Sequence, residues 1–144
     1  MQLGTRGTLL IEGFEKLALV AYLGQEGKPT IGWGHTGPDV HMGMTCTREQ
    51  ADAWFIQDTH AAVAGVNRSL SVTVNQNQFD ALVAFTFNVG VGAEAHSTLL
   101  RLVNGGDLTD AALEFAKWNK VGGQPSAGLT RRRAAEHDLF VSPS

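Results

Sequence analysis

The chain lacks the features that mark several common classes of protein. Cys46 is the only cysteine among 144 residues, so no disulfide can form within the chain. The fold therefore depends on a packed core, which suits synthesis in a reducing compartment. A net charge of −3 gives no overall basic surface of the kind that binds nucleic acid. We expect no nucleic-acid partner.

Long apolar runs are also missing. The N-terminal run Leu9-Leu10-Ile11 is interrupted by Glu12 and is too short for a signal-peptide core or a membrane span. We therefore expect no stable membrane span and no export signal in the sequence as it stands. The length and a hydrophobic fraction of 43% predict one compact domain over residues 1–144.

The pattern changes along the chain. Residues 22–43 are rich in glycine and contain short β-prone pieces, which predicts a small hairpin lobe. After Thr47 the pattern is helical: Thr47 and Gln50 form a capping box for a helix to about residue 66. Further helices are expected over residues 79–89, 97–104, 108–118 and 129–139.

These elements predict an α+β fold. A β-rich lobe is expected at about residues 17–45, and a larger helical lobe at about 46–144 that includes the N-terminal helix. A cleft between two unlike lobes is a common place for a ligand.

Two carboxylates stand out in this arrangement. Glu15 lies where the first helix should end, so it can face the cleft. Cleavage of an acetal at neutral pH needs a carboxylic acid that keeps its proton, and apolar neighbours favour the protonated form. Taken alone, however, a glutamate at a helix end is more often a solvated surface residue. Asp58 lies on the apolar face of the long helix and needs a partner, because an unpaired buried charge is costly.

The sequence around Glu15 resembles the phage lysozymes of glycoside hydrolase family 24, the T-even-type endolysins. Their signature is a glutamate, eight residues, an aspartate or cysteine, five residues and a threonine, followed by a glycine-rich strand ending in Gly-His. Glu15 and Thr30 occupy the first and last positions, and residues 30–35 match the strand. The resemblance continues through residues 75–82, 87–90, 97–100 and 128–133.

The resemblance implies a lysozyme-like fold and an N-acetylmuramidase that cleaves the MurNAc-GlcNAc β-1,4 bond of peptidoglycan during host-cell lysis. It makes Glu15 the general acid, with attack by a water on the opposite face and inversion. It implies peptidoglycan glycan strands as the partner, no cofactor and a monomer. The protein would be made in the host cytoplasm and would act on the wall in the periplasm after release.

The sequence departs from the family at the middle position of the signature. Gly24 stands there, and it has no side chain that could orient the attacking water. Glu26 is two residues away, but such a shift rarely preserves catalytic geometry. Either the site is weakened or Thr30 and a bound water suffice. The alternative is a peptidoglycan-binding protein with a lysozyme fold and little or no turnover.

The resemblance also suggests supporting residues. His35 and Asp58 match a structural pair between the strand end and the long helix. Asn88, Ser97, Thr98 and Arg132 match stretches that line the saccharide cleft, and so does Trp118, which is as readily a core residue. Roles as helix caps or turn groups suit Asn88, Ser97 and Thr98 equally well. His35 with His41 is weak evidence for a metal, and we expect no metal site.

Residues 117–137 carry five cations against the single anion Glu136. Such a run is usually a solvated helix face, although it could meet an anionic partner. A membrane-perturbing effect of this basic C-terminal segment is a third hypothesis. Packing on the domain is the better use of its few apolar residues.

Overall fold

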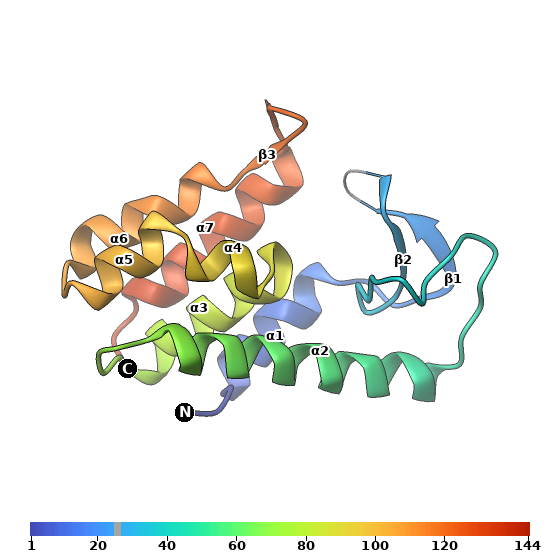
Figure 1. The fold of residues 1–144 in the computed structure, drawn as a ribbon, viewed down its shortest axis with the longest axis horizontal. Helices are drawn as coiled ribbons and strands as arrows, with labels where there is room; N and C mark the ends of the chain where they lie inside the picture. The colour runs from blue at the N-terminus through green and yellow to red at the C-terminus, as the bar shows by residue number, and fades with distance from the viewer. Residues whose placement is uncertain (25–26) are drawn as a thin grey trace.

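The computed structural model describes residues 1–24 and 27–144. Two antiparallel strands, β1 (Ala18–Leu23) and β2 (Pro29–Gly32), lie at one end of the long helix α2 (Arg48–Ser69). The remaining helices gather at its other end (Figure 1). The predicted α+β class is confirmed, with a small sheet beside a larger helical part.

Helix α1 (Thr5–Phe14) begins without a capping side chain of its own, because its N-cap is Gly4. Asp80 of α3 (Gln76–Val89) supplies the missing acceptor. The backbone N–H groups of Gly4 and Gly7 donate to its carboxylate at 2.9 and 3.2 Å. The helix ends at its C-cap, Glu15, as predicted. The start of α1 is thus hydrogen-bonded to α3. The C-terminal end of α1 places Glu15 at the junction with the β part.

The β part is small but has its own core. Ala21, Ile31 and Val40 are buried in it, and Trp54 of α2 packs against them. The other edge of β1 is paired as well: the N–H of Ala21 donates to Met44 O, and the N–H of Cys46 donates to Leu19 O, both at 2.9 Å. The two-stranded sheet is therefore held on one side by residues 44–46 and rests on α2.

The capping box predicted for α2 is present, since Thr47 Oγ1 accepts from Gln50 N and Gln50 Oε1 accepts from Thr47 N, both at 3.1 Å. The helix continues to Ser69, one turn further than expected, because nothing in the sequence breaks it there. None of the described helices is both long enough and apolar enough to cross a membrane.

The remaining helices are α4 (Val91–Ala95), α5 (Thr98–Asn104), α6 (Leu108–Glu114) and α7 (Ala127–Val141). Ser97, Asp107 and Ser126 cap α5, α6 and α7 through their side chains. The helix expected over 108–118 is shorter than predicted: α6 ends at Glu114, and the 3₁₀ turn η2 (Phe115–Lys117) follows.

A short hairpin, β3 (Lys120–Val121) and β4 (Gln124–Pro125), was not predicted. It forms because Gly122 and Gly123 both adopt positive φ, the conformation of a tight two-residue turn. The hairpin projects beside α7 on the side that faces the β part (Figure 1).

The main core surrounds α3, nine of whose residues are buried, which agrees with the apolar pattern of this segment. Phe85 of α3 meets Phe115 and Trp118 edge-on, with ring centroids 5.7 and 5.3 Å apart. Phe115 in turn contacts Phe140 of α7 at 5.4 Å. Aromatic packing therefore joins α3, η2 and α7 into one wall, on which the functional residues of α7 are carried.

Candidate active site

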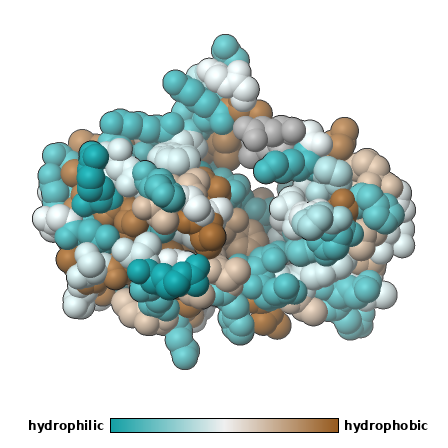
Figure 2. Space-filling view, viewed as in Figure 1, coloured by the Kyte–Doolittle hydropathy of each residue, from teal (hydrophilic) through white to brown (hydrophobic). Residues whose placement is uncertain are grey.

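A cleft of about 840 Å³ lies between the β part and the helical part. The space-filling view shows the molecule hollowed between them (Figure 2). The β side and the end of α1 contribute Glu15, Tyr22, Gly24, Lys28, Thr30 and Gly34; the helical side contributes Phe87, Asn88, Lys117, Trp118, Lys120, Arg132 and Arg133. Five of the sequence-predicted site residues therefore share one cleft: Glu15, Gly24, Thr30, Asn88 and Arg132.

Glu15 is held by an arginine. Its Oε1 accepts a hydrogen bond from Arg132 Nη1 at 2.7 Å, and the two side chains are only 14% and 7% exposed. The Arg132 guanidinium also lies 5.8 Å from the ring centroid of Phe14. Arg132 lines the cleft, as expected. It is buried there as the ion-pair partner of Glu15, because its position on α7 points the guanidinium at the end of α1.

The backbone of the β part touches the same carboxylate. Gly34 has φ +82°, a conformation that favours glycine, and a Cβ atom at this position would collide with the Glu15 carboxylate. The glycine of the Gly-His strand end therefore allows the β part to close against the acid.

Thr30 fills the space that a side chain at position 24 would need. Its side chain is buried, and its hydroxyl donates to the Lys28 carbonyl at 3.0 Å. A Cβ atom built on Gly24 would lie 2.5 Å from Thr30 Oγ1, well inside contact distance. The glycine and the threonine are therefore sterically matched. Glu26, the other candidate for the second group, lies outside the described residues.

A buried charge network extends from the arginine into α7. Glu136 is fully buried; its Oε1 lies 2.7 Å from Arg133 Nε, and its Oε2 lies 3.8 Å from Arg132 Nε. Burial raises the pKa of Glu136 to about 7, against the opposing charges of Arg133 and Arg132. Burial likewise lowers the pKa of Arg133. Arg132 and Arg133 of this basic segment are thus internal ion-pair partners rather than part of a solvated face.

Arg133 continues the network to Asn88. Its Nη2 donates to Asn88 Oδ1 at 2.9 Å. Since the amide oxygen is used in this way, the amide nitrogen of Asn88 remains as the donor that a ligand in the cleft could meet. The position agrees with the expectation that Asn88 lines the cleft.

Ser97 and Thr98 lie apart from this cleft. They border a separate hollow of about 350 Å³ together with His96 and Arg101. The Ser97 hydroxyl accepts from Leu100 N at 3.0 Å and donates to Glu94 O at 2.7 Å. It is committed to capping α5, which corrects our expectation that these two residues line the saccharide cleft.

The structure brings His35 and Asp58 into contact, with His35 Nδ1 2.8 Å from Asp58 Oδ2. Asp39 contacts the other ring nitrogen at 3.0 Å, a partner that the sequence did not suggest, and the ring stacks on Trp54 at 4.7 Å. Burial alone would lower the pKa of His35, but the hydrogen bonds and charges of Asp39 and Asp58 outweigh it and raise that pKa. The hydrogen bond from His35 lowers the pKa of Asp39.

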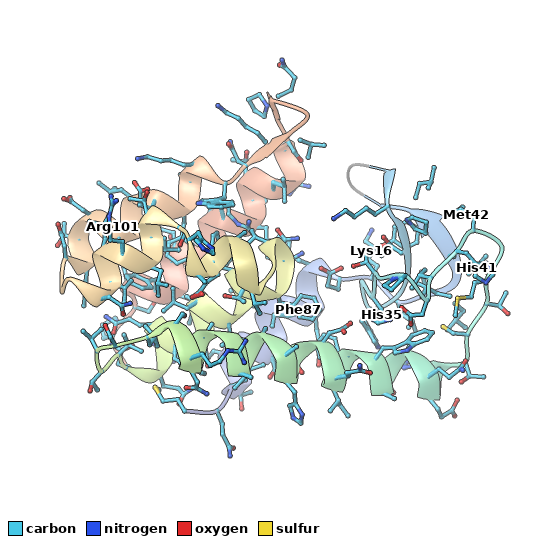
Figure 3. The ribbon with its side chains drawn as sticks, in the orientation of Figure 1. Lys16, His35, His41, Met42, Phe87 and Arg101 are labelled. Carbon is cyan, nitrogen blue, oxygen red and sulfur yellow. The ribbon has the colours of Figure 1, made fainter. Side chains whose placement is uncertain are left out.

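This histidine therefore joins the β part to α2, and its label in Figure 3 marks the place. His41 lies elsewhere, in the loop that follows (Figure 3). Among the residues that the structure describes, no group of three His, Cys, Asp or Glu side chains is placed to hold a metal ion.

Several cleft residues were missed by sequence reasoning. Tyr22 lines the cleft, and burial together with the negative charge of Glu15 raises its pKa. Phe87 lies at the junction of the two parts (Figure 3) and packs on Phe55 of α2 at 5.8 Å. Lys117 and Lys120 line the cleft from the helical side. Their membership of the basic segment was the one signal that could have identified them.

The C-terminal helix uses its apolar residues for packing. Leu129 and Phe140 are 8% and 2% exposed. The apolar face that a membrane-perturbing segment would need is thus turned toward the domain. This agrees with the interpretation that these apolar residues pack on the domain.

Comparison with known proteins places this geometry in context. Residues 12–136 match the family model described as phage lysozyme. The chain is 48% identical over 144 residues to an endolysin of Bacillus phage PZA, covering 99% of this chain and 56% of that protein. It thus spans little more than half the length of the first curated relatives that it matches.

Two solved structures are similar over almost their whole length. An endolysin from Escherichia coli O157:H7 phage FAHEc1 superposes with a TM-score of 0.84 at 40% identity, covering 98% of this chain and 94% of the other. The muramidase domain of SpmX from Asticaccaulis excentricus gives a TM-score of 0.85 at 40% identity and covers 99% of both chains.

Proposed function

This chain belongs to the phage lysozyme family, and on that premise we propose that it is a peptidoglycan hydrolase that cleaves the β-1,4 bond between N-acetylmuramic acid and N-acetylglucosamine. The observation that carries the proposal is the position of Glu15. Its carboxylate is largely buried in the cleft between the two parts, with Arg132 on one side and Gly34 on the other.

Glu15 acts as the general acid in this proposal. It protonates the glycosidic oxygen as the bond to the anomeric carbon breaks, which gives an oxocarbenium-like transition state. Among the described residues that line the cleft, Glu15 is the only carboxylate. A covalent glycosyl-enzyme would need a second carboxylate as nucleophile, so attack by water with inversion is the outcome that this set of residues favours.

Thr30 orients the attacking water. Its hydroxyl hydrogen is already donated to the Lys28 carbonyl, so the oxygen is left to accept a hydrogen bond from a water. A water held by one of its own hydrogens presents a lone pair for attack on the anomeric carbon, and its proton passes to solvent afterwards. The task that the family gives to an aspartate or cysteine together with a threonine falls here to Thr30.

The test is release of reducing ends from purified peptidoglycan by the Glu15→Gln variant. We expect a loss of roughly 10²- to 10⁴-fold with an unchanged circular dichroism spectrum, because the amide keeps the shape but cannot donate the proton. Glu12→Gln is the matched control, since Glu12 is an exposed glutamate on the same helix. Activity of Glu15→Gln within a few-fold of the parent would refute the assignment.

A peptidoglycan-binding protein with little turnover is the second candidate, and Gly24 is the observation that favours it. Co-sedimentation with insoluble peptidoglycan separates the two. Binding by the parent without any release of reducing ends would support this candidate over hydrolysis.

The names of the relatives support a role in lysis. We infer that the protein acts on the bacterial cell wall as an endolysin does, that it is made in the host cytoplasm and reaches the wall in the periplasm after release, and that it works as a monomer. Light scattering during size-exclusion chromatography tests the last point, and a mass near 15.4 kDa is expected.

A further inference from the structure

The walls of the cleft carry more positive charge than the rest of the molecule. Five of the described lining residues are cations and one is a carboxylate: Lys28, Lys117, Lys120, Arg132, Arg133 and Glu15. The chain as a whole has a net charge of −3. The cationic surplus is therefore a local property of the cleft, and it indicates a ligand that carries negative charge.

The buried arginines contribute little to such a ligand. The Arg132 side chain is 7% exposed and pairs with Glu15, and the Arg133 side chain is 1% exposed and pairs with Glu136. Their charges are already compensated inside the protein, so an anion in the cleft gains little from them. The lysines carry the charge that remains.

The lysines are exposed and lie on both walls of the cleft. Lys28 precedes β2 on the β wall, and Lys120 begins the β3–β4 hairpin, which projects toward the β part (Figure 1). Within the part of the chain that the structure describes, neither of them makes an ion pair. Lys117 contacts Glu114, which compensates part of its charge. Lys28 and Lys120 are thus the two cations best placed to receive an anion, one from each side of the cleft.

Peptidoglycan has carboxylates that can reach this place. In the proposed reaction a muramic acid ring binds beside Glu15, and such rings carry a short peptide on the lactyl group. The lactyl carboxyl is used in the amide bond to that peptide, so the ionised carboxylates are those of the peptide itself. An extended peptide covers about 3.3–3.6 Å per residue, so three residues reach roughly 10 Å beyond the sugar. The peptide can therefore pass from the ring to the rim of the cleft.

We propose that Lys28 and Lys120 bind carboxylates of the peptide stem and make the cleft selective for glycan that carries acidic peptides. The inference rests on the proposed function and specifies its substrate further. The two lysines do not act on the bond that is cleaved. They add affinity for the peptide-bearing strand and speed its association, whereas a neutral polysaccharide with the same β-1,4 linkage gains nothing from them.

Binding to peptidoglycan freed of other wall polymers tests the proposal. Lys28→Met and Lys120→Met are compared by co-sedimentation in a Glu15→Gln background, so that the result does not depend on turnover. At low ionic strength we expect each substitution to weaken binding about threefold and the double variant roughly tenfold. In about 0.5 M salt these differences should largely disappear, because exposed charges are screened. Lys117→Met should have a smaller effect than either, since Glu114 already compensates its charge.

Arg131→Met is the matched control. Arg131 is an exposed cation of the same basic segment that does not line the cleft. Its removal changes the net charge by the same amount and should leave binding unchanged, and Lys120→Arg, which keeps the charge, should bind as Lys120 does. A loss in Arg131→Met as large as that in Lys120→Met, or unchanged binding in the double lysine variant, would overturn the proposal.

The same peptidoglycan with its peptide carboxyls converted to amides identifies the group that the lysines bind. Protein with both lysines should bind this polymer roughly tenfold more weakly than the untreated one, whereas the double variant should bind both polymers alike. A lysine effect of equal size on both polymers would overturn the proposal, because the contact would not be to carboxylates. Lysine-dependent binding by a parent protein that releases no reducing ends would support this inference while refuting hydrolysis. Hydrolysis that requires Glu15 but binding that is insensitive to both lysines would refute this inference alone.

Discussion

The two walls of the cleft hold their functional groups by different means. On the α7 wall, charges hold charges: Arg132 reaches Glu15, and Glu136 lies behind Arg132 and Arg133. The described residues of the β wall form no such network at the site. Thr30 is held by a backbone carbonyl, and the backbone approaches Glu15 directly at Gly34.

This difference shows where each wall is sensitive. The charged wall depends on the protonation and pairing of buried groups, and its faults should appear in pH profiles. The β wall depends on close contacts at glycines that leave no room for a Cβ atom. We therefore expect the hydrolysis rate to fall when a single methyl group is added there. The predictions below test this contrast, beginning with the largest expected effect.

Gly34→Ala should be the most damaging change on the β wall. The added methyl would meet the Glu15 carboxylate, in a backbone conformation that already disfavours alanine. A displacement of the acid by about 1 Å is worth roughly 10²-fold in rate, so we expect a loss of that order in reducing-end release. Gly13→Ala adds a methyl into open space on α1 and should have little effect. Near-parent activity of Gly34→Ala would show that the β wall does not position the acid.

Thr30→Ala should reduce the rate by roughly 30-fold, a barrier increase of about 2 kcal/mol, because the hydroxyl that orients the water is removed. Thr30→Ser keeps the hydroxyl and should retain most of the activity. KM for soluble peptidoglycan fragments should change little in both variants. Equal losses for alanine and serine would mean that the threonine methyl, and not its hydroxyl, is what the site needs.

Position 24 tests the steric match on the same wall. The family pattern alone suggests that Gly24→Asp should accelerate cleavage, but the new Cβ would lie 2.5 Å from Thr30 Oγ1 and force this hydroxyl to move. We expect Gly24→Ala to lower the rate about tenfold, or about 1.4 kcal/mol in barrier. Gly24→Asp should be faster than Gly24→Ala and no faster than the parent. A clear gain in Gly24→Asp over the parent would show that the carboxylate outweighs the displaced threonine.

The ion pairs that His35 makes with Asp39 and Asp58 stabilise the fold, and the variant Asp58→Asn tests the size of this contribution. The raised pKa of His35 means that its contribution is complete below the unfolded value of about 6.5 and is lost as pH rises through the folded value. The lowered pKa of Asp39 adds a contribution that is present above about 3.9 and is lost as pH falls through its folded value. Together they favour a stability maximum between about pH 4 and 6.5.

At about pH 5.5 we expect Asp58→Asn to lose about 1–2 kcal/mol, or roughly 3–8 °C in Tm, and distinctly less near pH 8.5. Asp52→Asn, on the same helix but 52% exposed, should change Tm little at either pH. A loss that is independent of pH would show that packing, and not the charged histidine, explains the effect.

The sequence predicted elements whose signals are local. The capping box at Thr47 and the position of Glu15 at the end of α1 were both predicted correctly, because each depends on residues within one turn. The β3–β4 hairpin was missed, since two strands of two residues carry no periodic pattern and only Gly122-Gly123 marks the turn. The prediction that the helix continues beyond Glu114 was wrong for a related reason. A 3₁₀ turn differs too little from an α-helix to be distinguished by its composition.

Contacts between residues far apart in the sequence were harder to predict. Glu15 and Arg132 are 117 positions apart, and nothing local pairs them. A run of three arginines looks like a solvated face, whereas Arg132 and Arg133 are buried and Arg131 is exposed. Only the proximity of Glu136, one turn along the same helix, hinted at internal pairing. The match between Gly24 and Thr30 is likewise visible only when the backbone brings them together.

The long helix α2 has a mechanical consequence. Its 22 residues span about 33 Å, with the β part seated on one end and the main core on the other, so it behaves as a beam beneath both walls. The beam contains no proline, and its one glycine, Gly65, is packed tightly against Val91. We expect any bending between the β part and the main core to fall on the short link between α1 and β1, residues 15–17, and not on this helix. Glu15 is the first residue of that link, so such bending would change the width of the cleft and the orientation of the Glu15 carboxylate together.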